Sequence, residues 1–133
     1  MNYVSALNQY KSVGLQTGIV DATPHHLIAK LLEGALDRLA AAKGAINRNE
    51  IARKGELLSS VIAIVDGMRA SLDYQRGGEI AANLGSLYDY IERRLVEAGV
   101  SSDPAVLDEV SALLKEVKTG WDSVPAEARS MQS

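Results

Sequence analysis

The 133-residue chain has no cysteine and no surplus of basic residues. Without cysteine there can be no disulfides, thiol nucleophiles, or zinc and iron–sulfur sites with cysteine ligands. Such a composition is typical of a reducing compartment. The 14 lysines and arginines and 17 aspartates and glutamates give a net charge of −3. This balance argues against a dedicated nucleic-acid-binding protein.

Long apolar runs are also missing. The longest strongly apolar run covers residues 61–65 and is far shorter than the roughly 20 residues of a membrane-spanning helix. Residues 1–20 hold one positive charge, Lys11, and no continuous apolar segment, so they do not resemble a signal peptide. Hydrophobic residues still make up 47% of the chain and charged residues 23%. We expect one soluble, cytoplasmic domain over residues 1–133, without membrane insertion.

Apolar residues recur every three or four positions along four segments, which is the spacing of one helical face. Short links are predicted at Arg48–Glu50, Gln75–Gly78 and Gly99–Asp103, and short links favour antiparallel neighbours. The predicted fold is all-α: an antiparallel up-down-up-down four-helix bundle over residues 23–124, with a mobile N-terminal arm at 1–22 and a flexible tail at 125–133. The predicted core consists of Ile28, Leu32, Ala35, Leu39, Ala42 and Ile46; Leu58, Val61, Val65, Met68 and Leu72; Ile80, Leu84, Leu87, Ile91 and Leu95; and Leu107, Val110, Leu114, Val117 and Trp121.

The first two helices carry more apolar surface than one core face needs. Leu27, Leu31 and Leu36 widen the first stripe, and Leu57 and Ile64 widen the second. Either these helices are covered on two sides within the fold, or part of their surface forms a partner-binding groove. Six glycines inside the helical segments allow two matching interpretations, close helix packing or room for a partner's backbone.

Catalytic signals are weak. The two histidines, His25 and His26, are adjacent, so on a helix they point about 100° apart and do not readily chelate one metal. We expect both to be exposed residues of a first helical turn. The sequence has no zincin, di-iron or P-loop motif, so we predict no catalytic site, no metal and no cofactor.

The third helix offers a partner-binding surface. Asn83, Tyr90 and Arg94 follow one flank of its apolar stripe, and Leu87 lies between them and the core. Amide, aromatic and guanidinium groups suit recognition of a peptide. The alternative is ordinary surface chemistry, with Tyr90 and Tyr88 partly buried, their hydroxyls in water, and the two adjacent arginines paired with neighbouring acids.

The N-terminal arm has an apolar edge, because Leu7 and Tyr10 are spaced i, i+3. Such an edge needs a surface to pack on, and the wide faces of the first two helices are available. The predicted partner-binding residues are therefore Leu7, Tyr10, Leu57, Ile64, Asn83, Leu87, Tyr90 and Arg94.

Several motifs extend over nearly the whole chain. They read ATPHHLI at 22–28, LEGA at 32–35, GGEIAANL at 77–84, LYDY at 87–90 and RRL at 93–95, followed by Trp121. Together they resemble the family of flagellar secretion chaperones called FliS. The resemblance implies an antiparallel helical bundle that binds flagellin in the bacterial cytoplasm.

In that family, the bundle holds the disordered C-terminal segment of flagellin, prevents premature polymerisation and supports delivery to the flagellar type III export apparatus. The resemblance also associates the arm, with Leu7 and Tyr10, with partner binding and with covering the empty groove. Export-gate components and other flagellar regulators are candidate partners, and the protein is expected to be a monomer or weak dimer. The alternative is a small helical regulatory adaptor of the phosphotransfer or anti-regulator type, which would accept phosphate at His25 or His26.

Overall fold

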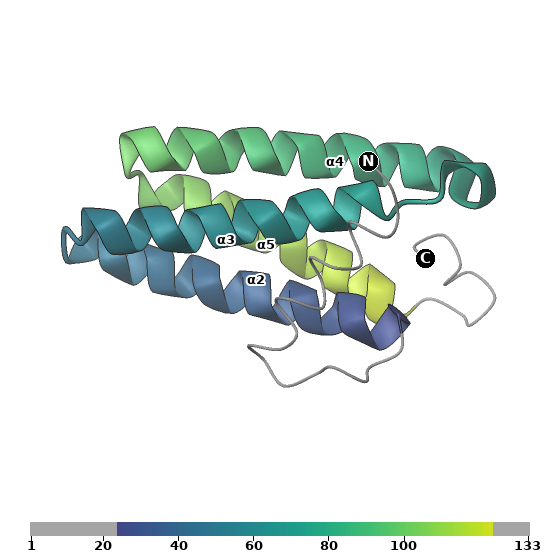
Figure 1. The fold of residues 1–133 in the computed structure, drawn as a ribbon, viewed down its shortest axis with the longest axis horizontal. Coiled ribbons are helices and arrows are strands. Elements are labelled where there is room, and N and C mark those ends of the chain that lie inside the picture. The colour runs from purple at the N-terminus through teal and green to yellow at the C-terminus, as the bar shows by residue number, and fades with distance from the viewer. Residues whose placement is uncertain (1–23, 124–133) are drawn as a thin grey trace.

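The computed structural model describes residues 24–123, which form four α-helices and no strand (Figure 1). The helices are α2, Pro24–Asn47; α3, Ile51–Ala70; α4, Tyr74–Ser101; and α5, Pro104–Asp122. The all-α prediction is confirmed for this part of the chain. The predicted arm and tail lie outside the described residues.

The helices pack side by side. Each contacts the next along the chain, and α2 also contacts α5. Figure 1 shows successive helices running in opposite directions, with α5 starting beside α4 and sloping toward the first turns of α2. Figure 1 thus shows α5 diverging from α4 toward the N-terminal end of α4.

The core is built from the predicted stripes of α2, α3 and α5. Every predicted residue of these stripes is buried, except Ile46 and Val117, which are partly buried against the core. Leu27, Leu31 and Leu57 are buried as well. The extra apolar width of α2 and α3 therefore belongs largely to the hydrophobic core, as expected for helices covered on two sides.

The predicted stripe of α4 is wrong at its N-terminal half. Ile80 is 56% exposed and Leu84 and Leu87 are only partly buried, whereas Tyr88 is completely buried rather than lying on a flank with its hydroxyl in water. The core face of α4 is shifted because it uses small residues beside one large aromatic ring. Its buried members are Gly77, Ala81, Gly85, Tyr88, Ile91, Leu95 and Ala98.

The link between α3 and α4 lies earlier than predicted. The Asp73 side chain accepts a hydrogen bond from the backbone N–H of Arg76 at 3.1 Å, so it caps a helix that already begins at Tyr74. Gly78 has φ 52° and ψ −125° and forms a kink inside α4 rather than the connection itself. Glycine tolerates this left-handed backbone at little cost.

The link between α4 and α5 is shorter than the predicted Gly99–Asp103. Gly99 lies inside the helix, and Ser102 adopts the left-handed conformation that ends it, with φ 54°. The buried Lys54 of α3 donates hydrogen bonds to the Gly99 carbonyl at 2.9 Å and to Ser102 Oγ at 2.7 Å. A cation at a helix C-terminus satisfies exposed carbonyls and opposes the helix dipole.

The first turn of α2 is fastened to the last turn of α5. The Trp121 ring stacks on His25, with centroids 4.5 Å apart, and its indole N–H donates to the His25 carbonyl at 2.9 Å. The expectation that His25 is exposed is therefore wrong, whereas His26 is exposed as predicted. The ring contact explains the difference, because it covers one histidine and not its neighbour.

The helical glycines do not share one explanation. A Cβ at Gly85 would collide with the Tyr74 hydroxyl, while a Cβ at Gly55 or Gly120 would meet nothing within 4 Å. Close packing therefore accounts for Gly85 but not for the other two.

Candidate functional site

The structure divides the predicted partner-binding residues into two groups. Leu57 and Ile64 lie on α3 with 7% and 2% of their surface exposed, whereas α4 carries the remaining described members. We call these the α4 ridge, and they are Asn83, Leu87, Tyr90 and Arg94. Leu7 and Tyr10 lie outside the described residues.

The α4 ridge borders α5. Tyr90 and Arg94 bond to Glu109 of α5, which fixes the antiparallel register of the two helices. Helical spacing places Leu87 and Asn83 on the same flank, about one turn and about two turns before Tyr90. The ridge is therefore part of the α4–α5 boundary rather than a free outer face.

An apolar strip runs along this boundary. On α4, Leu84 and Leu87 are partly buried, and on α5 Leu113 and Val117 are partly buried against the same core. From the Glu109 contact, α4 toward Leu84 and α5 toward Val117 run in the same direction along the bundle, so these pairs lie at similar levels (Figure 1). Ile80, more than half exposed, extends the strip where α5 slopes away. We call these five residues the α4–α5 strip.

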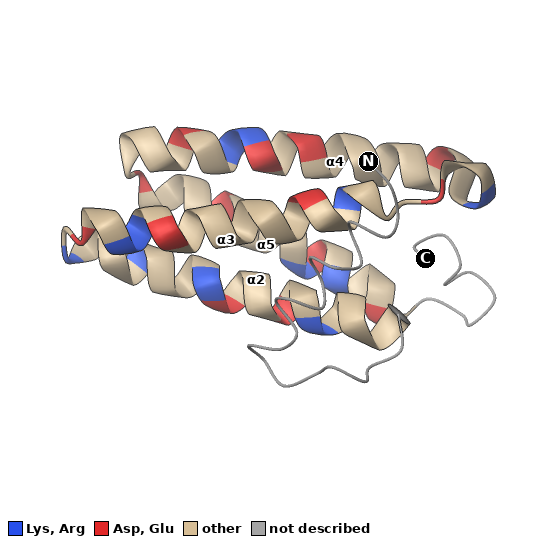
Figure 2. Cartoon of the chain, viewed as in Figure 1, with Lys and Arg blue, Asp and Glu red and all other residues tan. Residues whose placement is uncertain are grey.

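Charge is sparse on the α4 side of this strip. Between Arg76 and Asp89, α4 carries a single charged residue, Glu79. Figure 2 shows this stretch mostly in tan, whereas both signs of charge occur along the other half of the helix. A weakly charged surface that leaves aliphatic side chains partly exposed suits an apolar peptide segment.

One end of the strip is closed by a carboxylate clasp, defined as Tyr90, Arg94 and Glu109. The Tyr90 hydroxyl donates to Glu109 Oε2 and Arg94 Nε donates to Glu109 Oε1, each at 2.7 Å. Arg94 also donates to Glu97 at 2.7 Å. The bonds from Tyr90 and Arg94 lower the pKa of the Glu109 carboxyl. The Glu109 carboxyl is therefore ionised near neutral pH. Any stability that its two bonds contribute is lost as the pH falls through this lowered pKa.

Sequence reasoning missed Glu109. Its partners lie 15 and 19 positions away on another helix, so no local spacing in the sequence reveals the pairing. The prediction that Tyr90 keeps its hydroxyl in water is corrected by the same bond. The alternative in which the adjacent arginines pair with neighbouring acids holds for both, since Arg93 lies 3.2 Å from Asp89 and Arg94 bonds to Glu97 and Glu109.

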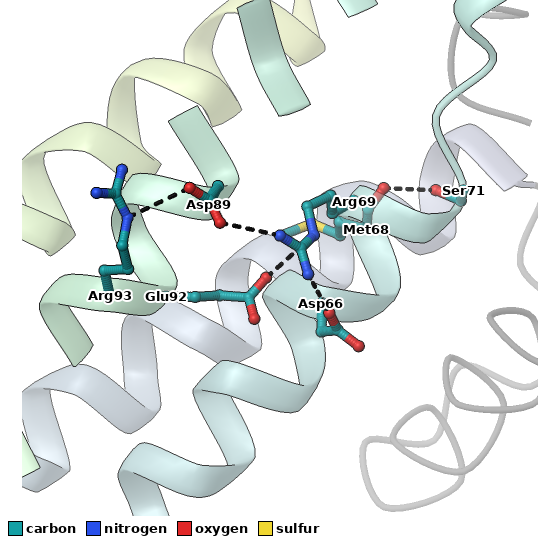
Figure 3. A network of polar contacts seen from close by, with 7 residues as sticks. All are labelled: Asp66, Met68, Arg69, Ser71, Asp89, Glu92 and Arg93. Carbon is teal, nitrogen blue, oxygen red and sulfur yellow. Dashed lines mark hydrogen bonds and ion pairs between the residues drawn. The ribbon is translucent and has the colours of Figure 1, made fainter. Parts of the chain in front are cut away.

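A second polar network ties α3 to α4 (Figure 3). Arg69 of α3 bonds to Asp66 at 2.9 Å and reaches Asp89 and Glu92 of α4 at 3.2 and 3.4 Å. Burial raises the pKa of Glu92, while the charge of Arg69 opposes that rise. All of these ion pairs join residues of α3 and α4, so we assign the network a structural role.

A hollow of about 550 Å³ lies between α2 and α3. Charged and polar side chains dominate its wall, and the apolar contribution comes from Leu57 and an alanine. Leu57 thus reaches the edge of this hollow, whereas Ile64 is not part of its wall. The lining residues are Asp37, Arg38, Ala41, Arg53, Glu56, Leu57 and Ser60.

Among residues 24–123, no cluster of histidine and carboxylate side chains is arranged to hold a metal ion. None of the four described helices is long and apolar enough to cross a membrane.

The chain is similar to proteins of flagellar secretion. A sequence model of the family described as "Flagellar protein FliS" matches residues 6–128. The chain is 50% identical over 124 residues to the flagellar secretion chaperone FliSB of Pseudomonas aeruginosa, covering 93% of this chain and 98% of that protein. It is 37% identical over 134 residues to the flagellar secretion chaperone FliS of Salmonella typhimurium, covering 100% and 99%. It is 32% identical over 106 residues to the corresponding Bacillus subtilis chaperone, covering 80% and 78%.

Proposed function

The chain belongs to the FliS family of flagellar secretion chaperones, and on this premise we propose that its client is flagellin. It acts in the bacterial cytoplasm, holds the disordered C-terminal segment of flagellin, prevents premature polymerisation and supports delivery to the flagellar type III export apparatus. It works by binding rather than by catalysis, without a cofactor. Export-gate components and flagellar regulators are further candidate partners, and the free protein is a monomer or weak dimer.

The observation that carries this proposal is the α4–α5 strip beside the α4 ridge. A disordered segment that orders on binding loses conformational entropy, so it needs apolar surface to offset that cost. The strip offers partly exposed aliphatic side chains, and Asn83 on the ridge adds an exposed amide that pairs with a peptide backbone.

The other predicted contacts complete the proposal. The bundle, with its up-down-up-down topology, is the rigid scaffold, and residues 1–22 form an arm that covers the empty surface through Leu7 and Tyr10. Leu57 and Ile64 are almost completely covered. They therefore contact flagellin only where binding uncovers them.

A regulatory adaptor is not favoured. The relatives described above are all named flagellar secretion chaperones. The ring of His25, one of the two histidines that an adaptor would phosphorylate, is stacked against Trp121.

Replacing Tyr90 with alanine is expected to weaken binding of the flagellin C-terminal segment by about 1–3 kcal/mol. Tyr90 supplies an aromatic surface and a hydroxyl at the end of the strip, while its ring lies off the core. The unfolding free energy is expected to fall by less than the binding free energy. Isothermal titration calorimetry and urea denaturation measure the two quantities.

Tyr74→Ala is the matched control, because Tyr74 is an exposed tyrosine of the same helix outside the α4 ridge. Equal losses of affinity for the two variants would contradict the assignment of the ridge. So would a Tyr90 variant that unfolds while the folded fraction binds normally.

A further inference from the structure

The carboxylate clasp has the geometry of a receptor for one carboxylate. Two donors of different kinds, a phenol and a guanidinium, approach the two oxygens of the same group at 2.7 Å each. Both donors belong to α4, and the carboxylate comes from α5. Water reaches the clasp, since 27% of the Arg94 side chain and 38% of the Glu109 side chain are exposed.

We propose that Tyr90 and Arg94 form a carboxylate-binding site, that Glu109 fills it in the free protein, and that a carboxylate of the bound partner segment replaces Glu109 there. This inference rests on the proposed function and adds the chemical group that the partner must supply. The carboxylate comes either from an acidic side chain or from the C-terminus of the segment.

Replacing Glu109 by a partner carboxylate costs little free energy, because the two donors bond to a carboxylate before and after the exchange. Surface ion pairs contribute little net stability, since water solvates the separated charges and the side chains regain freedom. Glu109 needs only to swing out into water from its partly exposed position on α5. The donors meanwhile satisfy an incoming carboxylate with the same two bonds.

The site stays organised when Glu109 leaves. Arg94 keeps its bond to Glu97 through a different nitrogen, so Nε remains directed toward the vacated position. The Arg93 guanidinium lies 5.9 Å from the centre of the Tyr90 ring and adds positive charge nearby. A preorganised receptor loses less entropy on binding than a flexible one.

Position gives the clasp access to a peptide. It lies at one end of the α4–α5 strip, so a segment lying along Ile80, Leu84 and Leu87 carries a nearby acidic group or its own terminus toward Arg94. Glu109 then acts as a competitor in cis, and its removal raises the affinity for carboxylate-bearing segments.

The test uses three forms of the flagellin C-terminal segment in calorimetric titrations: unmodified, C-terminally amidated, and with its acidic side chains replaced by the corresponding amides. The proteins are the wild type, Glu109→Gln, Arg94→Met and the control Asp108→Asn. The control removes the same charge from the neighbouring position of α5, where the carboxylate bonds to Lys43 of α2 instead. Circular dichroism verifies that each variant is folded.

We expect Glu109→Gln to bind the unmodified segment roughly threefold to tenfold more tightly than the wild type. Asp108→Asn should not reproduce this gain. The gain should disappear for one of the two modified segments, which identifies the source of the carboxylate, and Arg94→Met should bind all three forms alike. In the wild type, the NMR signal of the Arg94 Nε–H should shift on adding the unmodified segment and should not shift when its carboxylates have been removed.

Equal affinities of Glu109→Gln and Asp108→Asn, or equal binding of all three segments to Glu109→Gln, would overturn the exchange while leaving flagellin binding intact. An Arg94 Nε–H signal that shifts equally with and without the segment's carboxylates would also overturn the exchange, and this measurement needs no variant. If the unmodified segment fails to bind the wild type at all, the proposed function fails, and the exchange fails with it.

Discussion

Truncation of Trp121 to alanine is expected to lower the free energy of unfolding by about 3–5 kcal/mol. The side chain is buried at the end of α5, where it stacks on His25 and donates a hydrogen bond to the backbone of α2. Its loss leaves a cavity and releases the first turn of α2 from the end of α5. Urea denaturation followed by circular dichroism gives the change in unfolding free energy.

Trp121→Phe separates the two contributions of this residue. Phenylalanine retains most of the buried ring but cannot donate to the His25 carbonyl, so we expect a smaller loss that includes about 1 kcal/mol for the hydrogen bond. If Trp121→Ala lowers the unfolding free energy no more than Trp121→Phe does, burial of the ring does not stabilise the contact between α2 and α5.

Tyr88 is the second position where a large effect is expected. Its side chain is completely buried in the core, so Tyr88→Ala should cost about 3–5 kcal/mol of unfolding free energy. Its hydroxyl has no hydrogen-bond partner among the described residues, and burial raises the pKa of the group. An unpaired buried hydroxyl is costly, so Tyr88→Phe should leave the stability unchanged or raise it by about 1 kcal/mol.

Tyr90 provides a comparison for the prediction at Tyr88. The two residues have the same chemistry and lie on one helix, yet one hydroxyl is buried without a partner and the other bonds to Glu109. A destabilisation of more than about 1 kcal/mol by Tyr88→Phe would mean that its hydroxyl has a partner that the geometry does not show.

Most of the fold could be predicted from the sequence because α2, α3 and α5 place large aliphatic residues at regular helical spacing. The predicted core stripe of α4 is wrong in its N-terminal half for a physical reason, although Ile91 and Leu95 are buried as predicted. Small residues such as Ala81 and Gly85 are buried on the core face of α4 but contribute little to a hydrophobic pattern. A pattern based on large aliphatic residues therefore indicates the edge of that face instead of its centre.

Only part of the candidate site could be predicted from the sequence, for a related reason. Asn83, Leu87, Tyr90 and Arg94 share one flank of a helix, and that follows from local spacing. Glu109 bonds to Tyr90 and Arg94 because α5 packs against α4, and Lys54 caps α4 from α3. Such pairings are set by tertiary packing, which a single sequence does not specify.

Binding of the disordered C-terminal segment of flagellin on apolar surface is the function proposed for this chain. Calorimetric titration with that segment at several temperatures tests the proposal, with flagellin lacking the segment as the comparison. We expect binding of the segment, a clearly negative heat-capacity change and a gain of helix in the segment, together with loss of binding by the truncated flagellin. A heat-capacity change near zero with a segment that stays disordered by NMR, or undiminished binding of the truncated flagellin, would contradict the proposal.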